Sequence, residues 1–183
     1  MKKVVIVGAS RTPMGGFHGE MSQATAPELG GAAIKGAREN AGVKNESLDE
    51  DIMGNVLSAG QGQAPARQAS FNAGLSENVP AVTLNKMCGS GLKSVIYAHD
   101  QIKAGTSELV AAGGMESMTN APYLSPKMRA GARVGHQQMY DHMFLDGLED
   151  AYEPGRLMGT YAEDTAELFQ FTREQQDLSL IHI

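Results

Sequence analysis

The chain has a single cysteine, no run of five or more basic residues and no long hydrophobic segment. One cysteine cannot form an internal disulfide, which is typical of a protein from a reducing compartment. Lysine and arginine total 15 against 21 aspartates and glutamates, a net charge of −6, so nucleic acid and anionic membranes are disfavoured as partners. The apolar run near the start is too short for a signal peptide or a membrane span. These absences predict a cytoplasmic protein that acts on a small molecule.

The apolar pattern predicts alternating strands and helices over the first 114 residues. Residues 4–7 form a β-branched run without polar alternation, which predicts a central parallel strand covered on both faces. Residues 27–41 carry small and apolar residues four apart and end at Gly42, as a helix would. By the same criteria, we expect further strands at residues 51–57, 81–84 and 109–112, and further helices at residues 65–73 and 89–104.

The predicted helix ends recur at a regular interval. The triplets at residues 40–42, 72–74 and 103–105 all end in Ala-Gly, and their separation is the length of a strand plus a crossover helix. This predicts an α/β layered fold with a mostly parallel sheet. We expect an α/β domain over residues 1–118 and a partial second domain, an excursion packed over the sheet, over residues 119–183.

The excursion shows weaker signals. Helices are expected at residues 137–148 and 159–168. Thr172 and Gln175 form a capping box that predicts one more helix. That helix stops at an apolar tail, residues 178–183, without a C-terminal capping signal. We therefore expect the chain to lack its C-terminal part.

Cys88 is the strongest candidate for a chemical role. It follows a predicted strand and opens a predicted helix, where unpaired N–H groups and the helix dipole favour a thiolate nucleophile. Gly89, Ser90 and Gly91 are small, so the backbone can turn sharply and leave room for an acyl group, an arrangement like a nucleophile elbow. The N–H of Cys88 could stabilise a developing oxyanion. The alternative is a buried structural cysteine, and position alone favours neither.

Four blocks of sequence extend this interpretation. They are VGASRTP at residues 7–13, NKMCGSGLKS at 85–94, GGMESM at 113–118 and MGTYAE at 158–163. In this order they resemble thiolases, specifically acetyl-CoA C-acetyltransferases, and the resemblance runs from residue 3 to about residue 177. It implies a thiolase-like layered fold, of which this chain would hold the N-terminal half.

The resemblance also implies a reaction. Cys88 would accept an acetyl group from acetyl-CoA, and the enolate of a second acetyl-CoA would then take it to give acetoacetyl-CoA; the reverse reaction is thiolysis. Coenzyme A would be a substrate, no separate cofactor would be needed, and the full-length enzyme would be a homo-oligomer. Thiolases take their activating histidine and a second cysteine from the C-terminal half, so we expect this fragment alone to be inactive.

Other residues carry weaker expectations. The resemblance places Met158 in an apolar wall around the acyl group, and Leu157 stands where some acetyl-specific members have histidine, which puts short-chain preference in doubt. The GGMESM run is expected to shape the site. None of the five histidines has metal-ligand spacing, so no metal is expected. Ser10 and Pro13 replace glycines of a dinucleotide fingerprint, which argues against NAD.

Two alternatives to a thiolase stay open at this point. A condensing enzyme of the ketoacyl-synthase type also has a cysteine at a strand-to-helix turn, and would use acyl-carrier protein instead of coenzyme A. The second alternative is a truncated chain that catalyses nothing.

Overall fold

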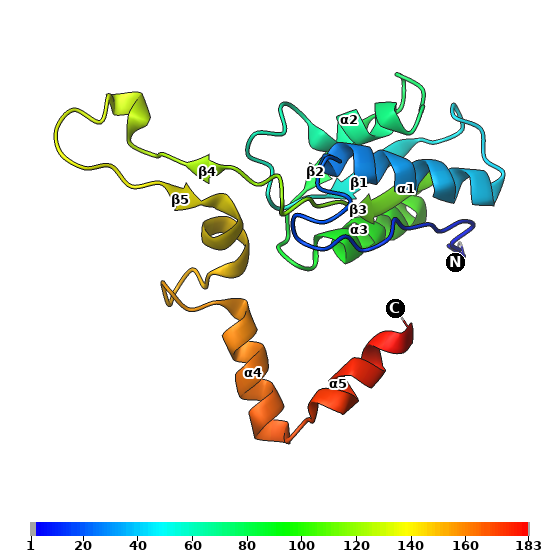
Figure 1. The fold of residues 1–183 in the computed structure, drawn as a ribbon. Coiled ribbons are helices and arrows are strands. Elements are labelled where there is room, and N and C mark those ends of the chain that lie inside the picture. Colours follow the sequence, from blue (N-terminus) through cyan, green and yellow to red (C-terminus); the bar gives the residue numbers. More distant parts are fainter. Residues whose placement is uncertain (1–2, 183) are drawn as a thin grey trace.

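A computed structural model describes residues 3–182, so residues 1–2 of the first predicted domain and residue 183 of the predicted tail lie outside the described part. The centre of the fold is a three-stranded sheet in the order β2-β1-β3 (Figure 1). The strands are β1 (Glu50–Gly54), β2 (Ala81–Leu84) and β3 (Val110–Gly114). Both neighbours of β1 run parallel to it. The predicted parallel α/β layer is confirmed.

Helices cover both faces of this sheet (Figure 1). They are α1 (Ala26–Ala41), α2 (Pro65–Asn72) and α3 (Ser90–Ala104), close to the bounds expected from the sequence. Alternation along β1 assigns its two faces: Asp51 meets Ser70 of α2, whereas Gly54 lies against Ser90 of α3. The sheet is therefore sandwiched, with α1 and α2 on one side and α3 on the other.

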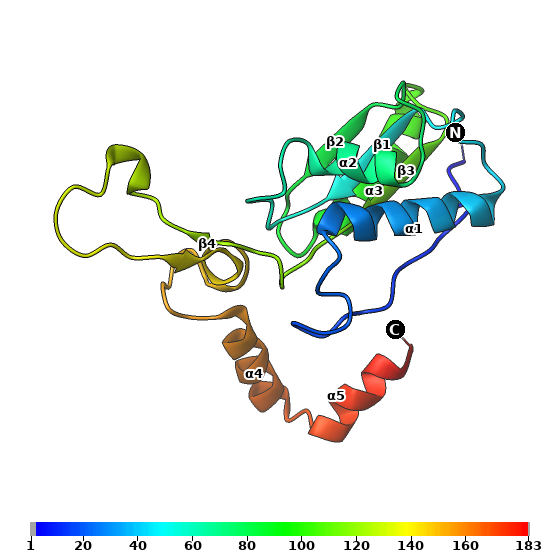
Figure 2. The ribbon, with the colours of Figure 1, turned by 45° about the horizontal axis from the view of Figure 1, so that its top comes forward.

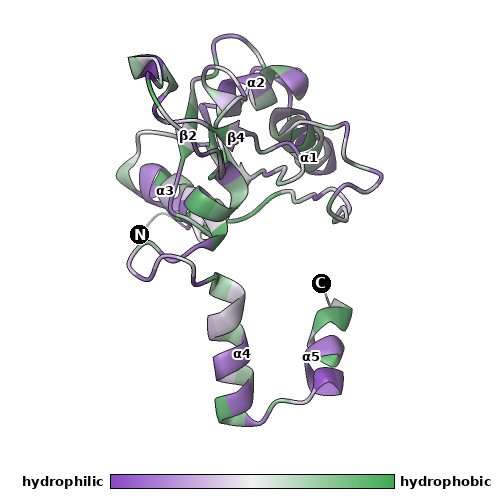
Figure 3. Cartoon of the chain, turned by 60° about the vertical axis from the view of Figure 1, so that its left-hand side comes forward, coloured by the Kyte–Doolittle hydropathy of each residue, from purple (hydrophilic) through white to green (hydrophobic). Residues whose placement is uncertain are grey.

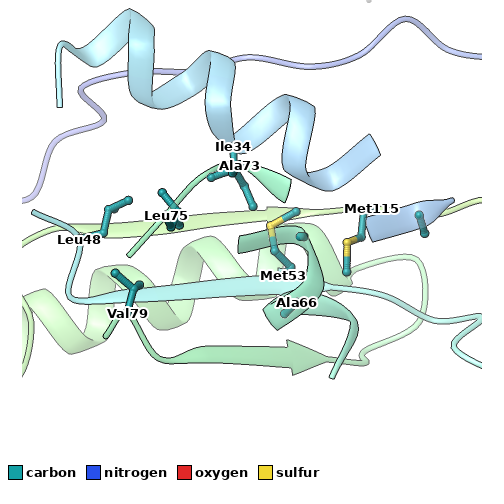
Figure 4. Packing of buried hydrophobic residues seen from close by; sticks show 10 residues of the cluster. Ile34, Leu48, Met53, Ala66, Ala73, Leu75, Val79 and Met115 are labelled. Carbon is teal, nitrogen blue, oxygen red and sulfur yellow. The ribbon is translucent and has the colours of Figure 1, made fainter. Parts of the chain in front are cut away.

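The main hydrophobic core lies between the sheet and the α1–α2 pair (Figure 4). Small residues let these elements approach closely. A Cβ on Gly30 would lie 2.6 Å from the sulfur of Met115, and one on Gly31 would lie 2.5 Å from Cβ of Asn72. The buried members of the core are Ala26, Ile34, Leu48, Met53, Ala66, Ala69, Ala73, Leu75, Val79 and Met115. The small-residue stripe expected on the first helix is thus its contact face.

The strand predicted at residues 4–7 is wrong. This segment is in no strand, and Val5, Ile6 and Val7 are 61%, 80% and 56% exposed. It runs beside α1 instead (Figure 2), where the Asn40 side chain donates a hydrogen bond to the carbonyl of Ala9 at 2.9 Å. No strand among residues 3–182 pairs with it, so the central position belongs to β1.

The excursion begins with a two-stranded antiparallel hairpin, β4 (Tyr123–Leu124) and β5 (Tyr140–Asp141), with a 3₁₀ turn, η1 (Met128–Ala130), in its long loop. The helix expected at residues 137–148 is therefore wrong in its first half, because residues 140 and 141 bond to β4. Only the residues after 141 are helical, and they end in a π-helical segment, η2 (Phe144–Leu148).

The last elements are α4 (Met158–Phe169), α5 (Arg173–Ser179) and a 3₁₀ turn, η3 (Leu180–His182). Both bonds of the predicted capping box form between Thr172 and Gln175. Helices α4 and α5 stand away from the α/β layer, with apolar residues exposed near the end of α4 and in η3 (Figure 3). Within residues 3–182 no helix has the length and hydropathy to cross a membrane. The domain boundary at residue 118 stays a prediction.

Candidate active site

Cys88 lies in the connection between β2 and α3. Helix α3 begins at Ser90 with Gly89 as its N-cap, and this cap provides no side-chain hydrogen bond. Cys88 is exposed and directly precedes the cap. The helix begins at Ser90, one residue later than the sequence predicted. The strand-to-helix turn is therefore present, and Cys88 lies two residues before the first residue of the helix.

The backbone of this turn has an unusual conformation. Met87 has φ +48°, a left-handed region that residues with a Cβ seldom occupy. The amide of Met87 donates to the side chain of Asn85 at 3.0 Å, and Ser90 is hydrogen-bonded to both Lys86 and Met87. The chain thus reverses sharply immediately before the cysteine.

Glycines bring the start of α3 onto the carboxyl ends of two strands. A Cβ on Gly54 would lie 2.6 Å from the carbonyl carbon of Ser90, and one on Gly114 would lie 3.2 Å from Cα of Gly91. Gly54 ends β1 and Gly114 ends β3. Cys88 is consequently held at the carboxyl edge of a parallel sheet, the edge at which α/β folds bind ligands.

A cavity of about 380 Å³ opens beside Cys88. Its walls are mostly apolar and come from three places: the sheet edge with its loops, the turn around Cys88, and the end of η2. The lining residues are Gly54, Val56, Leu57, Met87, Cys88, Ser90, Gly91, Gly114, Met115, Glu116, Met118, Gly147 and Leu148. Such a space suits an apolar group attached at the sulfur.

Glu116 is the only carboxylate in this lining. It accepts hydrogen bonds from the side chain of Asn55 at 2.8 Å, from the amide of Val56 at 2.9 Å and from the amide of Leu57 at 3.0 Å. Burial raises the pKa of Glu116, while the bonds from the two amides and the nearby His142 act in the opposite direction. The carboxylate therefore ties the loop after β1 to the loop after β3.

His142 ties the excursion to the same region. Its ring is buried; Nδ1 lies 2.6 Å from a carboxylate oxygen of Asp146, and Nε2 accepts a hydrogen bond from the amide of Ala59 at 3.3 Å. This places the proton on Nδ1 in the neutral ring. By docking the start of η2 here, His142 sets the wall formed by Gly147 and Leu148.

The predicted site residues are only partly brought together. Cys88, Ser90 and Gly91 line the cavity, and Gly89 is the adjoining cap. Leu157 is the N-cap of α4 and Met158 its first residue; neither lines the cavity, so their substrate role stays a prediction. Among residues 3–182, no group of three or more His, Cys, Asp or Glu side chains is placed to hold a metal.

Comparison with known proteins identifies the family. Residues 4–180 match the model of the thiolase N-terminal domain. The chain belongs to the thiolase family. This confirms the resemblance read from the four sequence blocks and decides against the ketoacyl-synthase alternative.

Several curated thiolase-family relatives are about half identical to the chain, and each carries the name acetyl-CoA acetyltransferase. The Cupriavidus necator protein is 51% identical over 177 residues, which is 97% of this chain and 45% of the relative. The Saccharomyces cerevisiae protein is 49% identical over 178 residues, 96% of this chain and 44% of the relative. The Escherichia coli protein is 49% identical over 183 residues, 100% of this chain and 46% of the relative. The chain thus spans about half the length of the relatives it matches.

Two polar residues of this thiolase-family site were not assigned a role from the sequence. Glu116 belongs to the GGMESM run that was expected to shape the site, and its position two residues after β3 was a further signal, since strand ends meet at one edge of a parallel sheet. Asp146 lies only four residues from His142, but the contact that docks His142 joins it to the amide of Ala59, 83 positions away, and no local pattern signals that contact.

Proposed function

We propose that the chain supplies the nucleophilic half of an acetyl-CoA C-acetyltransferase. One observation carries this proposal: the only cysteine is exposed at a strand-to-helix turn and lines an apolar cavity. The names of the relatives support acetyl-CoA and acyl-CoA thioesters as substrates. Coenzyme A is then a substrate, and no separate cofactor takes part.

The chemistry proceeds in two transfers. The Cys88 thiolate attacks the thioester carbonyl of acetyl-CoA, and coenzyme A leaves as a thiolate that takes up a proton. A second acetyl-CoA loses an α-proton to the second cysteine that thiolases supply from their C-terminal half, and the enolate so formed attacks the acetyl-cysteine and expels the Cys88 thiolate, giving acetoacetyl-CoA. Each tetrahedral intermediate carries an oxyanion, which the N–H of Cys88 stabilises.

The residues around Cys88 support this assignment. Gly89 and Gly91 have no side chain to obstruct an acyl group, and Met87 and Met118 give the cavity an apolar surface suited to one. We propose that Leu157 and Met158 approach this group only in the complete enzyme, as the family resemblance implies. The 183 residues hold no second cysteine, so we expect them to show no turnover alone.

We further propose that the complete enzyme is a cytoplasmic homo-oligomer. The Gibberella zeae relative is named as cytosolic, and the net charge of −6 is compatible with a soluble setting.

The test is a chimera in which residues 1–177 replace the matching half of the Escherichia coli relative. We expect it to form acetoacetyl-CoA, and we expect intact-mass measurement after acetyl-CoA exposure to show one acetyl group on Cys88. The Cys88→Ala chimera is the matched control and should lose both. A folded chimera without the acetyl group, or an active Cys88→Ala chimera, would overturn the proposal.

A further inference from the structure

One buried hydroxyl closes the turn that carries Cys88. Ser90 is 4% exposed. Its Oγ accepts a hydrogen bond from the amide of Lys86 at 2.8 Å and donates one to the carbonyl of Met87 at 2.6 Å. The amide of Ser90 reaches that same carbonyl at 2.9 Å. Ser90, which follows Cys88 in the chain, therefore bonds to both of the residues that precede Cys88.

Met87 needs such support. Its φ of +48° belongs to a region that a residue with a Cβ occupies only where its surroundings impose it. Relaxation of Met87 toward negative φ would reorient the next peptide unit, which belongs to Cys88. The Ser90 hydroxyl holds the amide of Lys86, one residue before Met87, and the carbonyl of Met87 itself, so its two bonds oppose that rotation.

The residue that carries this hydroxyl is packed against the sheet. A Cβ on Gly54 would be 2.6 Å from the carbonyl carbon of Ser90 and 2.7 Å from its Cβ. Gly54 ends the buried central strand β1. The position of the Ser90 side chain is thus set by contact with the buried central strand as well as by the exposed turn that it closes.

We propose that Ser90 is a positioning residue whose hydroxyl holds Met87 in its left-handed conformation and thereby fixes the thiol of Cys88 at the cavity. The consequence for acyl transfer rests on the proposed function. The ordering of the turn does not, because it follows from the hydrogen bonds alone.

The chain offers a direct probe of this order. Cys88 is its only cysteine, so a methanethiosulfonate nitroxide labels one site in the 183-residue chain. Electron paramagnetic resonance then reports how ordered that site is. In the wild-type chain we expect a spectral component from a nitroxide of restricted motion, called here the ordered component. Ser90→Ala should lose this component, whereas Ser90→Thr, which keeps the hydroxyl, should retain it.

Ser94→Ala is the matched control. Ser94 is also a buried serine of α3, and its hydroxyl donates to the carbonyls of Gly91 and Gly113 at 2.6 and 2.7 Å. It makes no bond to the turn, so its removal should leave the spectrum ordered. An ordered Ser90→Ala spectrum, or an equal loss in Ser94→Ala, would overturn the proposal.

A second variant covers a Ser90→Ala chain that fails to fold, as judged by circular dichroism. Asparagine tolerates the left-handed region better than methionine, so Met87→Asn combined with Ser90→Ala should restore folding and the ordered component; failure to restore them would count against Ser90 acting through Met87. The label involves no acetyl-CoA. An ordered wild-type turn whose chimera is not acetylated would therefore contradict the proposed function alone.

Discussion

Asp51 provides the sharpest prediction about stability. It lies in β1 with no exposed surface, and one carboxylate oxygen accepts a hydrogen bond from the hydroxyl of Ser70 at 2.5 Å. The other oxygen is buried without a protein partner among the described residues. Burial raises the pKa of Asp51 from 3.8 to about 6; the Ser70 bond lowers the pKa and the charge of Glu50 raises it further.

The sign of the effect follows from where the proton is held more tightly. The folded chain binds the Asp51 proton more strongly than the unfolded chain, whose aspartate has an ordinary pKa. The stabilisation from this proton is complete below about pH 4 and is lost as the pH rises through about 6. A difference of roughly two pKa units corresponds to about 3 kcal/mol of unfolding free energy.

Asp51→Asn isolates this contribution because asparagine does not titrate. Urea unfolding, followed by circular dichroism, measures the free energy of unfolding of both chains between pH 4 and pH 8. We expect the variant minus wild-type difference to rise by about 3 kcal/mol across this range and to level off above pH 7. Ser70→Ala is the control, and should enlarge the pH dependence because it removes a bond that favours the charged form. A difference that is constant with pH would refute the reasoning.

Two further predictions concern the candidate site. Gly54→Ala should lower the free energy of unfolding by about 2 kcal/mol or more, because its Cβ would meet the backbone of Ser90 at 2.6 Å; Gly159→Ala in α4, where nothing lies within 4 Å, should instead raise it by about 0.5–1 kcal/mol. Equal urea midpoints for the two variants would contradict the contact. Glu116→Gln should destabilise by about 1–3 kcal/mol, since its amide would turn an N–H toward that of Val56. Thermal unfolding measures this against the exposed Glu163→Gln, and an identical melting temperature would count against the role of Glu116.

Much of the α/β layer could be predicted because its signals are local. A helix of period 3.6 or a buried apolar run is written in consecutive residues, as is the capping box of Thr172 and Gln175. The position of Cys88 between β2 and α3 is of this kind. The small-residue stripe of α1 is also a local signal. The structure added that this stripe contacts α2.

Residues 4–7 show where local reasoning fails. Their composition is that of a buried strand, but a strand also needs a partner with free backbone groups, and composition does not name one. The prediction for residues 140–141 was wrong in the opposite sense. Their pattern indicated a helix, but they form a strand that is hydrogen-bonded to β4, at residues 123–124. Backbone pairing with residues elsewhere in the chain decided both outcomes: it is present for residues 140–141 and absent, among residues 3–182, for residues 4–7.

The amino-acid sequence alone predicted the order of strands and helices from residue 26 to residue 114, the family and the candidate nucleophile Cys88, because each depends on residues that are neighbours in the chain. Only the tertiary structure decided that β1 is central, that Gly54 and Gly114 admit the start of α3, and that Glu116 and His142 build the cavity wall. These last contacts join residues 59 to 83 positions apart. No local pattern encodes them, since their energy exists only once the sheet has brought the segments together.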